Sequence, residues 1–312
     1  MLRPPKARID PFQPLGILLE EERTVGGGIE SFLTVFLAGS ECPFTCVFCD
    51  LWRHTLDMPT PRGSLPAQLE RALGDEAVRR ARPRRVKLYN ASNFFDPRAV
   101  PPEDLPVLAK LLEPFDAVTV ECHPRLVGAA CLEFAGRLSG RLEVAMGIET
   151  VHPEALARLN KDVTLDDFDR AADSLRRAQI GIRAFALVGA PFIDPSEQAS
   201  WVSQSAAHAA QEGAEIVALI PVRGGNGELE RLAATGDFIP PTLADLERAL
   251  ESSLEASGEA IVIADLWDAE GLLGCLACRD ARIERLRGIN SSGEVPAHVR
   301  CTTCGGETGR QE

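Results

Sequence analysis

The sequence predicts an α/β protein built on a parallel β-sheet. Six short apolar runs, rich in β-branched and aromatic residues, alternate along the chain with segments of helical periodicity. This alternation is typical of strand–helix units joined by right-handed crossovers. Cysteines and polar side chains follow several of the runs, and in parallel α/β barrels the residues after the strands form the site.

The strands and helices are predicted from these patterns in chain order. Ser64 follows a turn and is expected to cap a helix, with Gln68 near the capping-box position. The predicted strands cover residues 32–37, 85–90, 117–121, 142–149, 182–188 and 215–221. The predicted helices cover residues 65–73, 105–112, 126–138, 166–178 and 197–211.

Three segments are expected along the chain. Residues 1–30 contain Pro, Gly and charge, with three glycines at 26–28, and are interpreted as a lead-in that wraps the core. Residues 31–265 hold the strand–helix units, and residues 266–312 form a small metal-binding segment with four cysteines. At 312 residues the chain is long enough for one barrel and such an appendage.

The composition favours a cytoplasmic enzyme. Nine cysteines, most of them in C-x2-C patterns, indicate metal ligands rather than disulfides. The polar start of the chain shows no signal peptide, and no apolar run is long enough to span a membrane. The net charge of −13 disfavours non-specific nucleic-acid binding, and the basic run at 79–87 is interpreted as a solvated helix end.

Cys42, Cys46 and Cys49 form a C-x3-C-x2-C run after the first predicted strand, with Phe48 directly before the third cysteine. The run offers three thiolates, whereas a [4Fe–4S] cluster ordinarily takes four. A cluster held by three cysteines leaves one iron with an open position, and a metal with an open position is a reaction centre. A zinc site and three buried structural thiols are the alternatives.

These residues resemble the radical S-adenosylmethionine (SAM) superfamily, whose members carry C-x3-C-x-aromatic-C after the first strand of a partial (β/α)6, TIM-like barrel. The resemblance implies that the three cysteines hold a [4Fe–4S] cluster whose free iron chelates the amino and carboxylate groups of SAM. An electron from the cluster then splits SAM into methionine and a 5′-deoxyadenosyl radical. The resemblance also implies a reductant such as ferredoxin or flavodoxin, and it places Phe48 against the adenine.

Four residues at strand ends are candidates for holding SAM. Asn90 and Ser92 stand where the superfamily has a Gly-Gly-Glu-like segment that binds the SAM amino group through backbone carbonyls, and an Asn-rich turn is the alternative. Glu149 closes the fourth strand and is expected to accept hydrogen bonds from the ribose. Arg183 enters the fifth strand and is expected to fork onto the SAM carboxylate. A structural salt bridge is the alternative for both charged residues. Other polar residues at strand ends are Asn93, Glu121, His123 and Arg125.

A closer resemblance covers residues 87–241 and points to the archaeosine synthase beta subunit and the Elongator catalytic subunit. It rests on the segments 92–97 (SNFFDP), 121–124 (ECHP), 143–149 (EVAMGIE), 160–161 (NK) and 238–241 (FIPP). Archaeosine synthase beta works on a modified guanine in tRNA, so a tRNA nucleoside is one expected substrate. The chain departs from that family after Cys49 and at its C-terminus, and its acidic charge and single Tyr favour a peptide or small metabolite instead.

Two further C-x2-C pairs lie near the C-terminus, Cys275 with Cys278 and Cys301 with Cys304. They place four thiolates for a tetrahedral zinc ion, and four cysteines equally suit a second, auxiliary [4Fe–4S] cluster. The charged segment between the pairs has few apolar residues, so metal binding is expected to supply its fold. Zinc is the favoured interpretation, and free thiols are the third.

The function predicted from the sequence is a radical SAM enzyme of unknown substrate. The alternative is a non-catalytic iron–sulfur or zinc scaffold or adaptor. SAM binding distinguishes the two, because a scaffold would keep its cluster without a change in its electron spin resonance signal when SAM is added. Cys122 and Cys131 are interpreted as ordinary packed cysteines.

Overall fold

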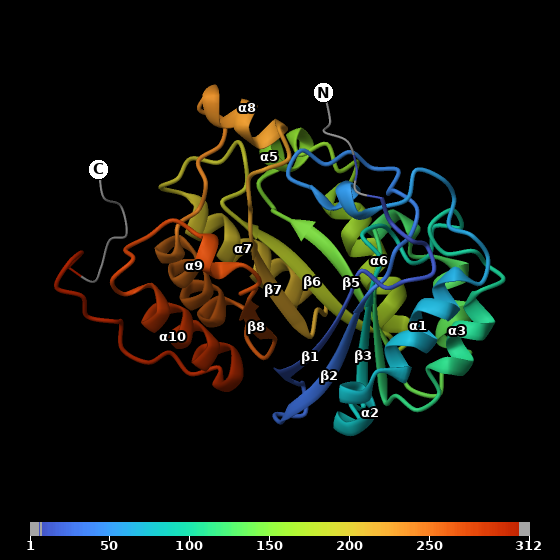
Figure 1. Cartoon of the computed structure of the whole chain (residues 1–312). Coiled ribbons are helices and arrows are strands. Elements are labelled where there is room, and N and C mark those ends of the chain that lie inside the picture. The colour runs from blue at the N-terminus through green and yellow to red at the C-terminus, as the bar shows by residue number, and fades with distance from the viewer. Residues whose placement is uncertain (1–5, 7, 306–312) are drawn as a thin grey trace.

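One β-sheet organises the structure, a computed structural model that describes residue 6 and residues 8–305. Within this part of the chain, eight strands curl into a half-barrel with helices on its outer face (Figure 1). The strand order follows the chain from β1 to β8, and β2 to β8 are all parallel. The predicted α/β partial barrel is confirmed.

The predicted strands correspond to β2 through β7, with bounds close to those expected. The strands are β1 (Gly16–Arg23), β2 (Ile29–Phe36), β3 (Arg85–Tyr89), β4 (Ala117–Glu121), β5 (Arg141–Glu149), β6 (Gly181–Val188), β7 (Ile216–Pro221) and β8 (Ile261–Ala264). The α-helices are α1 (Ser64–Gly74), α2 (Glu76–Ala81), α3 (Leu105–Leu111), α4 (Ala129–Ala135), α5 (Pro153–Arg158), α6 (Leu165–Arg177), α7 (Gln198–Gln211), α8 (Glu228–Ala234), α9 (Leu243–Ala256) and α10 (Arg279–Ser292). Short 3-10 helices are η1 (Leu51–His54), η2 (Pro124–Leu126) and η3 (Ala269–Gly271). No helix in the described residues is long and apolar enough to cross a membrane.

Two edge strands are additions to the six that the sequence predicts. β1 lies inside the expected lead-in 1–30 and pairs antiparallel with β2, whereas residues 1–5 and 7 of that lead-in lie outside the described residues. β8 is only four residues long and pairs with β7. Its shortness and the glutamates of β1 (GILLEEER) hide both strands from a search for apolar runs.

A network of buried charges fills part of the barrel interior. Arg183 on β6 donates from Nε to Glu143 at 2.9 Å and also pairs with Glu22 on β1. Lys87 on β3 pairs with Glu20 at 3.0 Å and with Glu22. Arg183 and Lys87 are both buried. The structure therefore contains a salt bridge at Arg183, which was the alternative to a contact with the SAM carboxylate.

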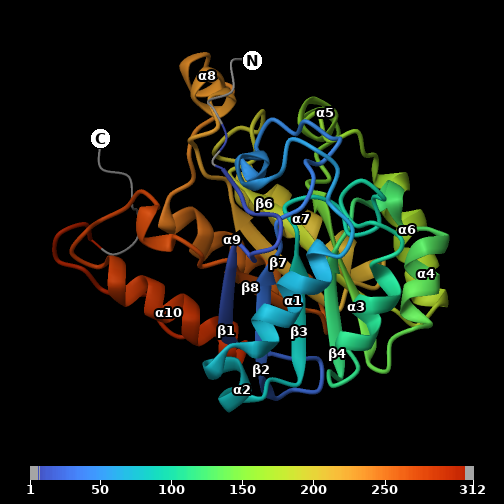
Figure 2. The same ribbon diagram turned by 45° about the vertical axis from the view of Figure 1, so that its right-hand side comes forward.

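The C-terminal helix α10 covers the open side of the half-barrel. It contacts the two outermost strands, β1 and β8, which do not pair with each other (Figure 2). The side chain of Asn290 donates to Ala264 O and accepts from Ala264 N, both at 2.8 Å, so it satisfies backbone groups at the β8 edge. Ile283, Leu286 and Ile289 join the main core. The few apolar residues of the segment between the cysteine pairs therefore pack into the core of the barrel and do not form a separate one.

Replacing Arg183 with methionine is expected to lower the free energy of unfolding by about 3–5 kcal/mol, because it leaves buried carboxylates without their cation. Burial raises the pKa of Glu22, but the charges of Arg183 and Lys87 outweigh it and bring that pKa down to about 2. A carboxylate whose folded pKa lies below its unfolded value of 4.5 contributes stability above pH 4.5, and this contribution is lost as the pH falls toward 2.

Urea denaturation followed by circular dichroism, at pH 7 and in steps from pH 5 to pH 3, measures both effects. The acid-dependent loss should be smaller in Arg183→Met than in the parent protein. Arg170→Met is the matched control, because Arg170 forms an exposed pair with Asp167 and its loss should change stability by less than about 0.5 kcal/mol. An Arg183→Met protein as stable as the parent would contradict the structural role of this network.

Candidate active site

The C-x3-C-x2-C run lies in a loop, residues 40–50, that follows β2 at the carboxyl edge of the sheet. Gln68 holds the start of this loop, since its Oε1 accepts from Ala38 N at 2.7 Å and its Nε2 donates to Ala38 O at 3.0 Å. The predicted capping role of Gln68 is therefore wrong: Gly63 is the N-cap residue of α1, and Ser64 lies inside the helix. The buried amide of Gln68 is used to fix the approach to the cysteines.

The loops after β3 and β4 contact the first part of the cysteine loop. The side chain of Asn93 donates from Nδ2 to Cys42 Sγ at 3.2 Å, and its Oδ1 accepts from His123 N at 2.7 Å. The ring of Phe44 stacks on the ring of His123, with centroids 3.8 Å apart and planes 14° from parallel. Asn93 and His123 thus position the cysteine loop from two neighbouring strand ends.

The segment after α5 contacts the middle of the loop. Asn160 donates from Nδ2 to Thr45 O at 2.9 Å and to Thr45 Oγ1 at 2.7 Å. The backbone N–H of Val47 donates to Leu159 O at 3.0 Å. These contacts join residues more than one hundred positions apart in the sequence, as the spacing of 115 between Asn160 and Thr45 shows.

Asn226, after β7, holds the end of the loop. Its Nδ2 donates to Val47 O at 2.8 Å and to Cys49 O at 3.3 Å, and its Oδ1 accepts from Leu229 N at 2.9 Å in the first turn of α8. Phe48 is half-buried against a small apolar cluster that includes Leu229. Asn226 is not among the site residues predicted from the sequence, although an Asn between glycines just before a helix is a capping signal.

The three thiols of the loop are largely surrounded by protein. Burial raises the pKa of Cys46 to about 12 and that of Cys49 to about 11, and it also raises the pKa of Cys42. These thiols therefore hold their protons at neutral pH until a metal takes the proton's place. Their sulfur atoms do not all lie within 4.8 Å of one another, which makes this a wider arrangement than a site for one tetrahedral ion.

Glu149 lies at the end of β5, close enough to the cysteines for its charge to raise the pKa of Cys46 and Cys49 after the larger effect of burial. Its backbone is left-handed, with φ of 62°, and its buried carboxylate pairs with Lys161. Lys161 Nζ also donates to Gly147 O at 3.0 Å, and a side chain at 147 would collide with both groups. Lys161 is not among the site residues predicted from the sequence, and the structure places it beside Glu149. The ribose contact of Glu149 stays a prediction.

Asn90 and Ser92 follow β3 and leave polar atoms without partners. Asn90 is fully buried, and neither its Nδ2 nor its Oδ1 has a hydrogen-bond partner within the described residues. Ser92 Oγ is also buried and unpartnered there. Buried polar groups normally have partners, so these atoms fit a ligand that carries donors and acceptors.

The three polar residues at the end of β4 and just after it have different environments. Glu121 lies on the same face of β4 as Thr119, whose hydroxyl donates to Glu143 in the barrel interior. Burial raises the pKa of Glu121 to about 7, although its side chain keeps some accessible surface. His123 is buried, whereas Arg125 is exposed and bonds to Asp162. Glu121 therefore combines a position in the barrel interior with a raised carboxyl pKa.

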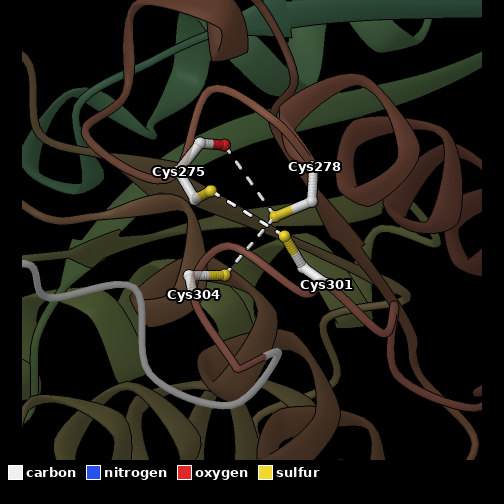
Figure 3. A group of neighbouring side chains, drawn as sticks. All are labelled: Cys275, Cys278, Cys301 and Cys304. Carbon is white, nitrogen blue, oxygen red and sulfur yellow. Dashed lines mark hydrogen bonds between the residues drawn. The ribbon is translucent and has the colours of Figure 1, made fainter.

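The four C-terminal cysteines form a separate group in which all four sulfur atoms lie within 4.8 Å of one another (Figure 3). The sequence-predicted grouping of Cys275, Cys278, Cys301 and Cys304 is therefore present. Cys122 and Cys131 are buried in the main core, in agreement with their interpretation as packed cysteines.

No family model matches the chain. The chain is similar to the uncharacterized protein MJ0550 of Methanocaldococcus jannaschii, with 22% identity over 268 residues that cover 82% of this chain and 73% of that protein. Among solved structures, it is similar to a radical SAM methyltransferase from Sphaerobacter thermophilus, with 16% identity, a TM-score of 0.53, and coverage of 82% of this chain and 78% of that one.

Two other solved structures share the fold. The FeFe-hydrogenase maturase HydG from Carboxydothermus hydrogenoformans has 14% identity and a TM-score of 0.53, over 82% of this chain and 56% of that one. Archaeal Elp3 from Methanocaldococcus infernus has 12% identity and a TM-score of 0.51, over 64% of this chain, and the chain spans about half (52%) of its length. The chain therefore has the fold of the radical SAM superfamily, which confirms that resemblance, and an Elp3 structure is among the neighbours.

His123 is expected to stay neutral down to about pH 5, because burial and the nearby charge of Lys161 lower its pKa to about 4. Its Nδ1 accepts from Arg125 N at 3.2 Å, so Nε2 carries the proton and donates to Lys161 O at 3.0 Å. Since the unfolded chain takes up this proton near pH 6.5, the contribution of His123 to stability should fall between pH 6.5 and pH 4.

A titration of histidine NMR signals in iron-free protein measures this directly, with His123→Gln used to assign the signal. A midpoint for His123 near 6.5 would contradict the buried, neutral ring that stacks on Phe44.

Proposed function

We propose that this chain is a radical SAM enzyme in which Cys42, Cys46 and Cys49 hold a [4Fe–4S] cluster. When bound, that cluster would supply an electron to cleave SAM into methionine and a 5′-deoxyadenosyl radical that abstracts hydrogen from the substrate. The observation that carries the proposal is the position of the C-x3-C-x2-C loop at the carboxyl ends of the strands of a radical SAM half-barrel.

The residues around the loop fit such a cluster. A cluster binds each thiolate at a different iron, so it suits sulfur atoms that are farther apart than those of a one-ion site. The Nδ2 of Asn93 donates to Cys42 Sγ, and hydrogen bonds to cluster sulfurs are one means by which a protein sets the reduction potential. Asn160 and Asn226 hold the loop backbone on its other side and keep it in place.

The proposal assigns SAM to the rim beside the loop. The unpartnered atoms of Asn90 and Ser92 would bond to its polar groups, and Phe48 would lie near its adenine. Glu149 would accept from the ribose, since a carboxylate has lone pairs beyond those that Lys161 uses. Arg183 is left out of the proposed site, because Glu22 and Glu143 already engage its guanidinium.

The proposal includes a reductant such as ferredoxin or flavodoxin and a second metal at the four C-terminal cysteines, either zinc or an auxiliary [4Fe–4S] cluster. The substrate stays a prediction from the sequence, with a tRNA nucleoside as one class and a peptide or small metabolite as the other. Mass spectrometry of ligand or RNA that co-purifies without oxygen distinguishes these classes.

Protein reconstituted with iron and sulfide under anaerobic conditions is expected to form 5′-deoxyadenosine when dithionite and SAM are added. Cys46→Ala should abolish both the product and the cluster absorbance, because two thiolates do not hold the cluster. Cys131→Ala is the control: this cysteine is buried in the main core and is not part of the cysteine loop, so product formation should persist.

The electron spin resonance signal of the reduced cluster should change when SAM is added. A fully reconstituted, reduced protein that gives no 5′-deoxyadenosine and no change in this signal would contradict the proposal and support a non-catalytic iron–sulfur scaffold.

Asn90→Leu is expected to weaken SAM binding about tenfold or more while leaving stability unchanged or raised, because the amide it removes has no partner in the folded protein. Asn93→Leu is the comparison, since Asn93 has partners on both amide atoms and its loss should cost stability. Titration calorimetry with SAM and thermal denaturation measure the two effects. Unchanged SAM affinity in Asn90→Leu would mean that this side chain does not contact SAM.

A further inference from the structure

The C-terminal cysteine group has the dimensions of a site for one ion. The Sγ atoms of Cys275 and Cys301 are 4.0 Å apart, and those of Cys278 and Cys304 are 3.8 Å apart. Figure 3 shows all four side chains pointing toward a common centre. Both separations are far longer than the roughly 2.05 Å of a disulfide, so the four thiols are not paired covalently.

We propose that Cys275, Cys278, Cys301 and Cys304 bind one zinc ion, and that this ion holds α10 across the open side of the half-barrel. Tetrahedral zinc with Zn–S bonds of about 2.3 Å places its ligand sulfurs about 3.8 Å apart, which matches the observed separations. A [4Fe–4S] cluster puts each thiolate on a separate iron and needs a wider cage than sulfurs that all lie within 4.8 Å provide. The proposal does not depend on the radical SAM function.

Local backbone structure orients the ligands. Cys278 is the N-cap residue of α10, and its N–H donates to Cys275 O at 3.3 Å, which closes the turn between the first two cysteines. The backbone N–H groups of Thr303 and Cys304 reach Cys301 Sγ and close the second turn. Hydrogen bonds to ligand atoms fix their orientation, so both turns present their sulfurs ready for a metal.

The N-terminus of α10 and Arg279 would offset the negative charge of a zinc ion bound by four thiolates. Four thiolates and Zn²⁺ carry a charge of −2, and the partial positive charge at the N-terminus of α10 lies beside them. α10 carries four arginines close to the site in sequence, at positions 279, 282, 285 and 287. Arg282 and Arg285 are instead buried against Glu247 on α9, and Arg287 pairs with Glu284 and Glu270. The arginine left beside the site is Arg279, which bonds to Leu272 O at 3.4 Å.

The ion would join the two ends of the segment that contains α10. Each sulfur pair connects residues 26 positions apart, with the whole helix between them. Arg285 lies within α10 and donates to two carbonyl groups beyond its end, Pro296 O at 2.7 Å and Ala297 O at 3.2 Å. These bonds hold the chain where it turns back toward the cysteines. Since α10 supplies the contacts of Asn290 with the β8 edge, a metal that fixes both ends of the segment also fixes that edge.

Metal analysis of the Cys42→Ala, Cys46→Ala, Cys49→Ala triple variant tests the identity of the ion without any contribution from the radical SAM site. One zinc and no iron per chain is the expected result. About four irons per chain in this variant would mean an auxiliary cluster, and a protein with neither metal but four reactive thiols would mean free cysteines. Either of these results would overturn the proposal, whether or not the parent protein cleaves SAM.

Hydrogen exchange measured by mass spectrometry tests the role of the ion. Adding Cys301→Ser and Cys304→Ser to the triple variant should remove the zinc and speed exchange in α10 and in residues 261–264 by about tenfold or more. The helices α1 and α3, which lie away from α10 (Figure 1), should keep their rates. Adding Cys131→Ala instead should leave the zinc and the exchange unchanged. If the serine variant does not fold, a zinc chelator applied to the triple variant and then reversed with Zn²⁺ gives the same comparison. Loss of zinc with unchanged exchange in α10 would overturn the structural role.

Discussion

An open half-barrel has two sheet edges to protect and an interior to fill, and much of this structure follows from how the chain meets those two needs. β1 turns back on β2, and α10 covers the side where β1 and β8 fail to pair. Inside, Arg183 and Lys87 balance the carboxylates that β1 carries inward. With the sheet fixed in this way, its carboxyl ends offer a rigid rim to which an irregular cysteine loop can be bonded.

The fold could be predicted from the sequence wherever a strand is apolar on both faces. β2 to β7 lie between the barrel interior and a layer of helices, so their apolar runs are visible without a structure. β1 and α10 could not be predicted in this way, because they do not have such apolar runs. Their charged residues look solvated in the sequence but are buried against opposite charges that come from distant elements, as Glu22 is against Arg183 and Arg285 against Glu247.

The candidate site was predictable where chemistry fixes local spacing and not where it depends on distant contacts. The intervals between cysteines predict both proposed metal sites, because thiolates must converge on a metal from one or two turns. Asn226 and Gln68 bond to the cysteine loop or to its start from distant positions in the sequence, so local sequence patterns do not predict these contacts. Arg183 is a further example, since its ion pairs with Glu22 and Glu143 join three strands and cannot be seen in the sequence around it.

The order of elements along the chain has a consequence for how the protein is made. The sheet is complete at Ala264, whereas α10 begins at Arg279 and the last cysteine pair follows at Cys301. While these later residues are still within the ribosome, the new β8 edge exposes unpaired backbone groups that can pair with other nascent chains. α10 is therefore the last element needed to cover that edge, and a chain that stops before Arg279 is expected to leave the backbone groups of β8 open to pairing with another strand.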